Sequence, residues 1–167
     1  LAHHYQNDSV YRHADLTGDS LKLARLSSES PAQFMVFCGV HFMAEVASIL
    51  AKPHQIVLLP DLEAGCSMAD MADPDSVERA WKHLGSVVSA DESIVPVTYI
   101  NSSAALKAFC GRHGGIVCTS SNSRSVLEWA LERRPKVLFF PDQNLGRWTA
   151  YTMGIPKESI VLYRPQL

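Results

Sequence analysis

Three consecutive polar residues, Ser120, Ser121 and Asn122, are the clearest candidates for chemistry in this sequence of 167 residues. They precede an apolar pattern of helical period, so their hydroxyl groups and backbone N–H groups should lie at the N-terminus of a helix. A carboxylate or a phosphate binds well at such a place, because the N–H donors and the helix dipole point toward it. Capping of the helix explains the same residues equally well. For the segment 18–20 the same two interpretations hold, and there the cap is favoured.

Cys66 is a candidate metal ligand or nucleophile, because the glycine before it permits a tight loop near the end of a strand. A single cysteine is more often a small buried apolar residue, and that interpretation is kept for Cys38, Cys110 and Cys118. The four cysteines are far apart and form no C-x₂-C pair, which excludes a zinc ribbon and a ferredoxin-type run. Free or metal-bound thiols in a chain with a large apolar core indicate a reducing cytoplasm.

The elements that must position these side chains are short apolar strands alternating with segments of helical period. Each strand is apolar throughout, which is typical of parallel strands covered by helices on both faces. This alternation predicts the α/β class, with small parallel sheets and right-handed crossovers. The predicted strands are 34–38, 56–59, 94–99, 116–118 and 137–140. The predicted helices are 19–28, 41–50, 75–84, 103–109, 123–133 and 144–153.

Unusual polar residues follow one strand after another, at the edge where parallel α/β sheets bind their ligands. The sequence opens in the end of a strand that carries His3 and Tyr5. Tyr99 and Asn101 follow a later strand, and Cys66 lies beyond another. Caps and turns do not explain tyrosine, histidine and cysteine at the same edge. We therefore predict a binding site there.

The chain also repeats a pattern. Residues 36–50 match residues 117–131, and in both copies the next strand ends in a Pro-Asp pair, at 60–61 and at 141–142. A third correspondence sets residues 2–5 beside residues 97–99. The shared order indicates a duplication, with a polar linker between the copies. We predict a first α/β domain over residues 1–88 and a second over residues 89–167.

Charge and composition limit the classes of partner. The chain carries 15 Lys and Arg against 17 Asp and Glu, a formal net charge of −2, so it offers no basic surface for nucleic acid or an acidic membrane. No apolar run is long enough to span a bilayer. Neither a P-loop nor a G-x-G-x-x-G motif occurs, which argues against a nucleotide cofactor.

Seven stretches of the chain carry a family resemblance. They are AHHYQ at 2–6, GDSL at 18–21, GVHFMAE at 39–45, LPDLEAGCSMADM at 59–71, YINSSA at 99–104, CTSSN at 118–122 and PDQNLGR at 141–147. In this order they resemble the quinolinate synthase family, and together they span nearly the whole chain.

The resemblance implies three similar, pseudo-symmetric three-layer αβα domains around one central site, of which this chain holds two and lacks the third. It implies condensation of iminoaspartate with dihydroxyacetone phosphate to quinolinate, in the de novo biosynthesis of NAD. It also implies L-aspartate oxidase as functional partner. The cofactor of the family is a [4Fe–4S] cluster held by three cysteines, one from each domain, with one iron open to substrate.

The resemblance assigns roles to single residues. His3 and Tyr5 are similar to the catalytic pair of the first domain, and Tyr99 and Asn101 to that of the second. Phenol and imidazole groups suit the proton transfers of imine formation and loss of water. The hydroxyl-bearing residues that would bind a substrate carboxylate or phosphate are Ser20, Thr119 and Ser120.

Of the three cluster ligands of the family, only the first has a counterpart here, at Cys66. The chain ends at Leu167 before the other two, so we expect this polypeptide alone to be inactive and free of a cluster.

Two other functions are consistent with the same residues. The first is a small-molecule module that binds an anion and uses no redox metal. The second is a zinc or thiol enzyme in which Cys66 acts with His3 or His41. A purely structural role fits least well, given the tyrosine, asparagine and histidine residues at one edge.

Overall fold

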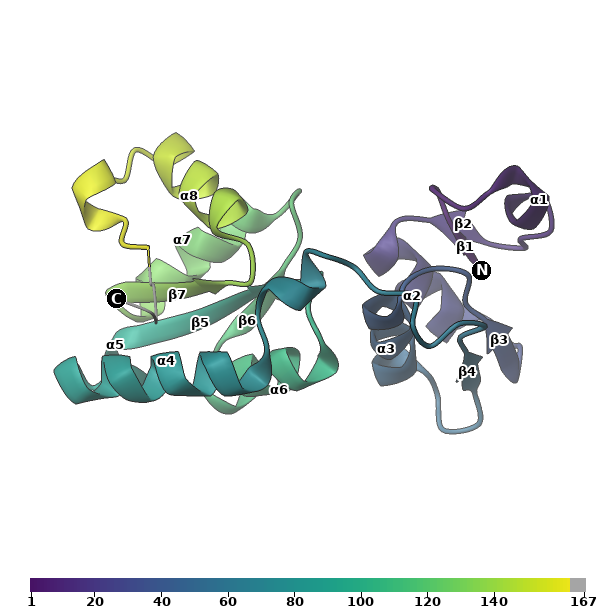
Figure 1. Ribbon diagram of the computed structural model, residues 1–167, viewed down its shortest axis with the longest axis horizontal. Helices are drawn as coiled ribbons and strands as arrows, with labels where there is room; N and C mark the ends of the chain where they lie inside the picture. The colour runs from purple at the N-terminus through teal and green to yellow at the C-terminus, as the bar shows by residue number, and fades with distance from the viewer. Residues whose placement is uncertain (163–167) are drawn as a thin grey trace. The chain divides into compact units, whose positions relative to one another are not determined.

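The computed structural model of the protein describes residues 1–162. These residues form two compact units, one over Leu1–Ser67 and one from Met68 onward (Figure 1). Both units consist of short parallel strands joined by helices, so the predicted α/β class is confirmed. The last five residues of the predicted second domain lie outside the described part of the chain.

The first unit is built on parallel pairs of very short strands. β1 (Ala2–His3) pairs with β2 (Thr17–Gly18), and β3 (Phe34–Val36) pairs with β4 (Ile56–Leu58). A parallel bridge between Ala2 and Cys38 joins the two pairs. The strands therefore run side by side in the order β2, β1, β3, β4.

Two longer helices cover one face of these strands. α2 (Ser20–Glu29) and α3 (His41–Leu50) pack against each other, and Met35 of β3 is buried on their side. The short helix α1 (Asp8–Tyr11) connects β1 to β2. Asp19 caps α2 by accepting a hydrogen bond from the backbone N–H of Lys22, 2.8 Å away, which fixes where that helix begins.

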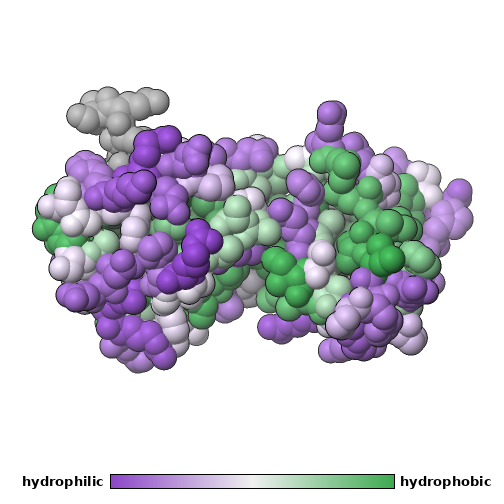
Figure 2. Space-filling view, turned by 90° about the horizontal axis from the view of Figure 1, so that it is seen from below, coloured by the Kyte–Doolittle hydropathy of each residue, from purple (hydrophilic) through white to green (hydrophobic). Residues whose placement is uncertain are grey.

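The opposite face of β3 and β4 is open to solvent. Side chains alternate along a strand, so Met35 is 4% exposed while its neighbour Phe34 is 60% exposed. The same alternation exposes three further apolar side chains of these strands, Val36, Ile56 and Leu58. Figure 2 shows apolar surface on this unit. The prediction that these two strands are buried on both faces is wrong for the described residues. A hollow of about 490 Å³ lies beside this face, lined by α1, β1 and β3.

The second unit is built on one sheet of three parallel strands. The central strand β5 (Ile94–Tyr99) has β6 (Ile116–Cys118) on one side and β7 (Lys136–Phe140) on the other. Gly115 lets β6 approach β5, because a Cβ atom at this position would lie 2.0 Å from the carbonyl oxygen of Pro96.

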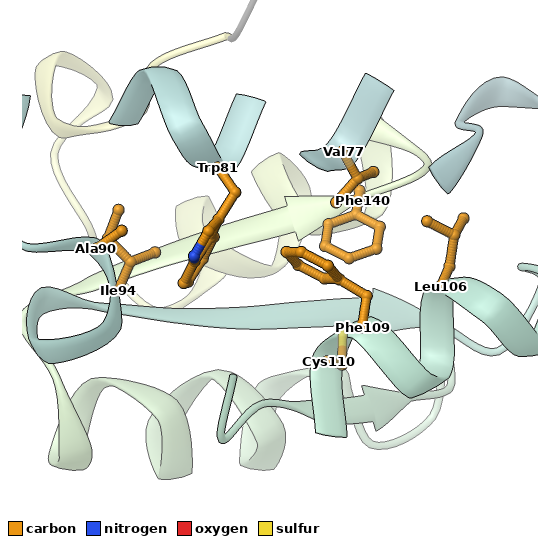
Figure 3. Close-up of a cluster of buried hydrophobic side chains, with 8 residues drawn as sticks. All are labelled: Val77, Trp81, Ala90, Ile94, Leu106, Phe109, Cys110 and Phe140. Carbon is orange, nitrogen blue, oxygen red and sulfur yellow. The ribbon is translucent and has the colours of Figure 1, made fainter. Parts of the chain in front are cut away.

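Helices cover both faces of this sheet, which gives the three layers expected of each domain. The helices of this unit are α4 (Pro74–Val87), α5 (Ala90–Ser93), α6 (Ala104–Arg112), α7 (Ser123–Arg133) and α8 (Gln143–Thr152). On one face, Trp81 of α4 meets Phe109 of α6 edge to face, with 5.5 Å between the ring centroids (Figure 3). On the other face, Val126 and Ala130 of α7 pack against Val97 of β5.

The boundary between the two units falls after Ser67, earlier in the sequence than the predicted boundary after residue 88. α4 lies before that boundary, yet its buried residues Val77 and Trp81 share one apolar cluster with Ile94, Phe109 and Phe140. Burial of this helix on the second sheet therefore assigns residues 68–87 to the second unit.

The path of the chain is similar in the two units, but the strands correspond differently from the predicted repeat. That repeat matched β3 with β6 and β4 with β7. β3 and β4 pair directly, whereas β6 and β7 each pair with β5, so the match is wrong. The strand orders β2-β1-β3 and β6-β5-β7 agree with the predicted correspondence of residues 2–5 (β1) with residues 97–99 (β5), and they match β2 with β6 and β3 with β7.

The described part of the chain holds no helix with the length and apolar character needed to cross a bilayer.

Candidate functional site

The ends of the strands in the first unit bring most of its predicted site residues to one edge. His3 ends β1 and pairs with Gly18, the last residue of β2. Ser20 begins α2 two residues later, and because Asp19 provides the cap, the hydroxyl of Ser20 is not needed for capping. Cys66 lies in the loop that follows β4. The edge therefore carries an imidazole, a hydroxyl and a thiol.

The rings of His3 and Tyr5 are stacked on each other at this edge. Their centroids are 3.9 Å apart and the ring planes are inclined by 37°. Burial lowers the pKa of His3, and the neighbouring His4 lowers it further, while the carboxylate of Asp19 opposes both effects. The imidazole is consequently neutral at neutral pH and can accept a proton.

The hydroxyl group of Tyr5 lies at the start of α3. It donates a hydrogen bond to Sδ of Met43 at 3.6 Å. Burial raises the pKa of Tyr5, and the nearby Cys66 raises it further, whereas a hydrogen bond from the backbone of Val40 lowers it. Tyr5 and Cys66 therefore influence each other electrostatically within the first unit.

Cys66 differs from the buried thiols of the chain. It is half-buried in a loop, whereas Cys110 and Cys118 lie in the core of the second unit. Burial raises the pKa of both core thiols to about 12, which keeps them protonated and unsuited to metal binding. Cys38 is also half-buried, but it lines the hollow beside α1. Of the two half-buried thiols, Cys66 is the one in the loop that follows β4.

The described residues do not by themselves complete a metal site. Among residues 1–162, no three histidine, cysteine, aspartate or glutamate side chains come together. Cys66 supplies a single thiol, so a metal site that uses it needs further ligands from residues other than these.

The second unit presents a corresponding edge. Tyr99 ends β5 and pairs with Cys118, the last residue of β6. Asn101 follows two residues later, and Thr119 and Ser120 follow β6. Tyr99 is partly buried against the cluster of Val95 and Val97, so the core holds one side of its ring. Within this unit the predicted residues Tyr99, Asn101, Thr119 and Ser120 follow neighbouring strand ends.

The loop between β6 and α7 is held by Asn122. Its side-chain oxygen accepts from the backbone N–H of Thr119 at 2.7 Å and from the Thr119 hydroxyl at 3.0 Å. Asn122 makes no side-chain hydrogen bond to α7, so it does not act as an ordinary N-cap. The interpretation of residues 120–122 as a simple cap is therefore wrong for this asparagine. Ser120 is exposed at the turn.

Two residues of the site region escaped the sequence analysis. Met43 contacts the hydroxyl of Tyr5 from 38 positions along the chain, and no local pattern marks a contact between residues so far apart. Val40 contributes a backbone group, which no side-chain motif can reveal. Asp142, a polar residue at the end of β7, has a structural role: its carboxylate accepts hydrogen bonds from the backbone N–H groups of Asn144 and Leu145 and so caps α8.

Comparisons with known proteins identify the family of this chain. The family described as "Quinolinate synthetase A protein" matches residues 1–165. A quinolinate synthase of Corynebacterium glutamicum is 61% identical over 99% of this chain and 42% of its own length. Those of Halalkalibacterium halodurans and Rhodopirellula baltica are 56% and 57% identical, each over 99% of this chain and 45% of their own length. The chain thus spans less than half the length of these relatives, and it belongs to the quinolinate synthetase A family.

Proposed function

We propose that the whole protein containing this chain is a quinolinate synthase, which condenses iminoaspartate with dihydroxyacetone phosphate in the de novo biosynthesis of NAD. The observation that carries the proposal is the stacked pair of His3 and Tyr5 next to the thiol of Cys66, in a chain of the quinolinate synthetase A family. A base, an acid and a possible iron ligand are what imine formation and loss of water require.

The residues of the strand edges divide this work. Neutral His3 accepts a proton from a substrate group, and Tyr5 hydrogen-bonds to a substrate oxygen or nitrogen. Tyr99 and Asn101 are the residues of the second unit that take part in catalysis in this proposal. Both substrates are anions, so the hydroxyl groups that bind their carboxylate and phosphate groups are those of Ser20, Thr119 and Ser120.

Cys66 holds one iron of a [4Fe–4S] cluster in this proposal. When bound, such a cluster with an open iron acts as a Lewis acid on substrate oxygens. The half-buried position of Cys66 near Tyr5 supports this role, since a cluster there would lie beside the catalytic pair. The other thiolates come from the part of the whole protein that this chain does not include.

The cellular setting belongs to the same proposal. All four cysteines of the chain are free thiols, which favours a reducing cytoplasm. Iminoaspartate has to be supplied by oxidation of an amino acid, and we propose L-aspartate oxidase as the enzyme that supplies it.

The test is quinolinate formation by the full-length protein after anaerobic loading with iron and sulfide. Tyr5→Phe and His3→Ala should each reduce kcat by about 100-fold or more, because each removes a group that moves protons. Tyr11→Phe removes a phenol hydroxyl from the same unit at a position away from the site edge, and it should leave the rate unchanged. Absence of quinolinate from the loaded wild-type protein would overturn the proposal.

The 167-residue chain alone should make no quinolinate and should hold less than one cluster per chain, since this proposal assigns a single thiol of the chain, Cys66, to the cluster, and no three possible metal ligands come together among residues 1–162. Iron and sulfide analysis after anaerobic reconstitution measures this. A stoichiometric cluster on the isolated chain would contradict the assignment of the missing ligands to the rest of the protein.

A further inference from the structure

The contact between Tyr5 and Met43 is the least expected feature of the site edge. Met43 lies in the first turn of α3 and is 3% exposed, whereas Tyr5 is 56% exposed. The Tyr5 hydroxyl donates to Sδ of Met43 over 3.6 Å. A buried side chain thus holds the polar end of an exposed one.

The hydrogen bonds of the Tyr5 hydroxyl determine what it can offer a ligand. A phenol hydroxyl has one proton to donate and two lone pairs that accept. Its proton is directed to Met43, and the backbone of Val40 hydrogen-bonds to its oxygen. One lone pair remains for a group that approaches from the open side of the edge.

The sulfur atom of Met43 is itself held in place. A Cβ atom at Gly39 would lie 3.0 Å from Sδ of Met43 and 3.1 Å from Cε1 of Phe37. The glycine therefore leaves room for the thioether, and the ring of Phe37, which is fully buried, forms the other side of the space.

We propose that Met43 is a positioning residue for Tyr5. Its thioether accepts the hydrogen bond that the Tyr5 hydroxyl donates, and this orientation leaves one lone pair of the phenol oxygen to accept a hydrogen bond from the substrate. Tyr5 then receives a hydrogen bond from a substrate hydroxyl or amine at this lone pair. This inference rests on the proposed function for its effect on rate, while the orientation of the hydroxyl is a property of the first unit alone.

The test uses Met43→Leu in the full-length, cluster-loaded protein, with Met35→Leu as matched control. Both substitutions replace a buried methionine by a side chain of similar volume, and only the first removes the acceptor. Loss of one weak hydrogen bond should lower kcat by about fivefold and leave KM within about twofold.

A second readout needs no activity: the ¹³Cζ resonance of Tyr5, assigned through Tyr5→Phe, should shift in Met43→Leu and stay in place in Met35→Leu.

Gly39→Ala should lower kcat and shift the Tyr5 resonance in the same way, although Met43 itself is not substituted. The added methyl group would lie 3.0 Å from Sδ of Met43 and should displace the sulfur atom. The proposal is overturned if the Tyr5 resonance is the same in Met43→Leu and in wild type, or if KM rises while kcat is unchanged. Failure of the wild-type protein to make quinolinate would count against the proposed function, and the resonance of Tyr5 would still decide the orientation of its hydroxyl.

Discussion

At the scale of single residues, burial separates the thiols of this chain into two chemical groups. Cys110 and Cys118 are in the core of the second unit, where burial raises the pKa of each to about 12. Cys66 is half-buried in a loop. Since the thiolate is the reactive form, the core thiols should be unreactive at pH values where ordinary thiols react.

Alkylation of the folded chain with iodoacetamide at pH 8 should therefore modify Cys66 before Cys110 or Cys118. Raising the pH toward 10 should increase the fraction of thiolate at the two core positions only slightly, because a group with a pKa of about 12 remains protonated there. Peptide mapping by mass spectrometry measures the order of modification, and alkylation in denaturant is the control. Equal rates at all positions in the folded chain would show that the core thiols are accessible.

The types of the site residues could be predicted from the sequence, but their contacts could not. Tyrosine, histidine and cysteine residues after apolar strands predict a binding edge of a parallel sheet, and in the structure His3 ends β1 and Cys66 lies in the loop after β4. The bond from Tyr5 to Met43 depends on the packing of α3 against the sheet. The hydrogen bonds of Asn122 depend on the conformation of its loop, and the same residue type would serve equally as a cap.

At the scale of elements, close approach of two strands requires glycine at position 115, whereas no such contact constrains Gly111. Gly115 lies just before β6, and a Cβ atom there would lie 2.0 Å from the Pro96 carbonyl oxygen and 2.7 Å from its ring. Gly111 is in α6, and a Cβ atom there would have no neighbour within 4 Å. The same substitution should therefore have opposite effects at the two positions.

Gly115→Ala should lower the free energy of unfolding of the second unit by about 3 kcal/mol, because the methyl group forces β6 away from β5. Gly111→Ala should raise it by about 0.5 kcal/mol, since alanine loses less backbone entropy than glycine in a helix. Urea denaturation followed by circular dichroism gives both values. A neutral effect of Gly115→Ala would mean that the strands separate at little cost.

The longer elements could be predicted from the sequence because their patterns are unambiguous. Observed and predicted bounds are the same for the strands 94–99 and 116–118 and for the helices 41–50 and 123–133. β2 and α1 were not predicted, since two and four residues are too few to show a period. Sheet order was also out of reach: similar Pro-Asp endings led to a match of β4 with β7, whereas the order of strands depends on contacts distant in sequence.

At the scale of the whole molecule, the position of the boundary between units can be tested with two fragments. Residues 68–167 keep α4, whose Trp81 packs on Phe109. Residues 89–167, the predicted second domain, lack this helix and leave the apolar cluster around Ile94 uncovered.

We expect the longer fragment to unfold cooperatively with heat. The shorter fragment should show no cooperative transition, because burying a tryptophan and its neighbours contributes several kcal/mol, on the order of the stability of a whole domain. Differential scanning calorimetry of the two fragments distinguishes the cases. Cooperative unfolding of residues 89–167 would restore the boundary near residue 88.

The open face of β3 and β4 has a consequence for how the chain behaves in solution. In the second unit α4 and α6 together cover one side of the sheet, whereas in the first unit α1 has no such companion helix among residues 1–162. The isolated chain should therefore self-associate through this face, and its light scattering per unit mass should increase with concentration. Ile56→Lys should keep it monodisperse to higher concentration, and Ile49→Lys, a change at an exposed position of α3, should not.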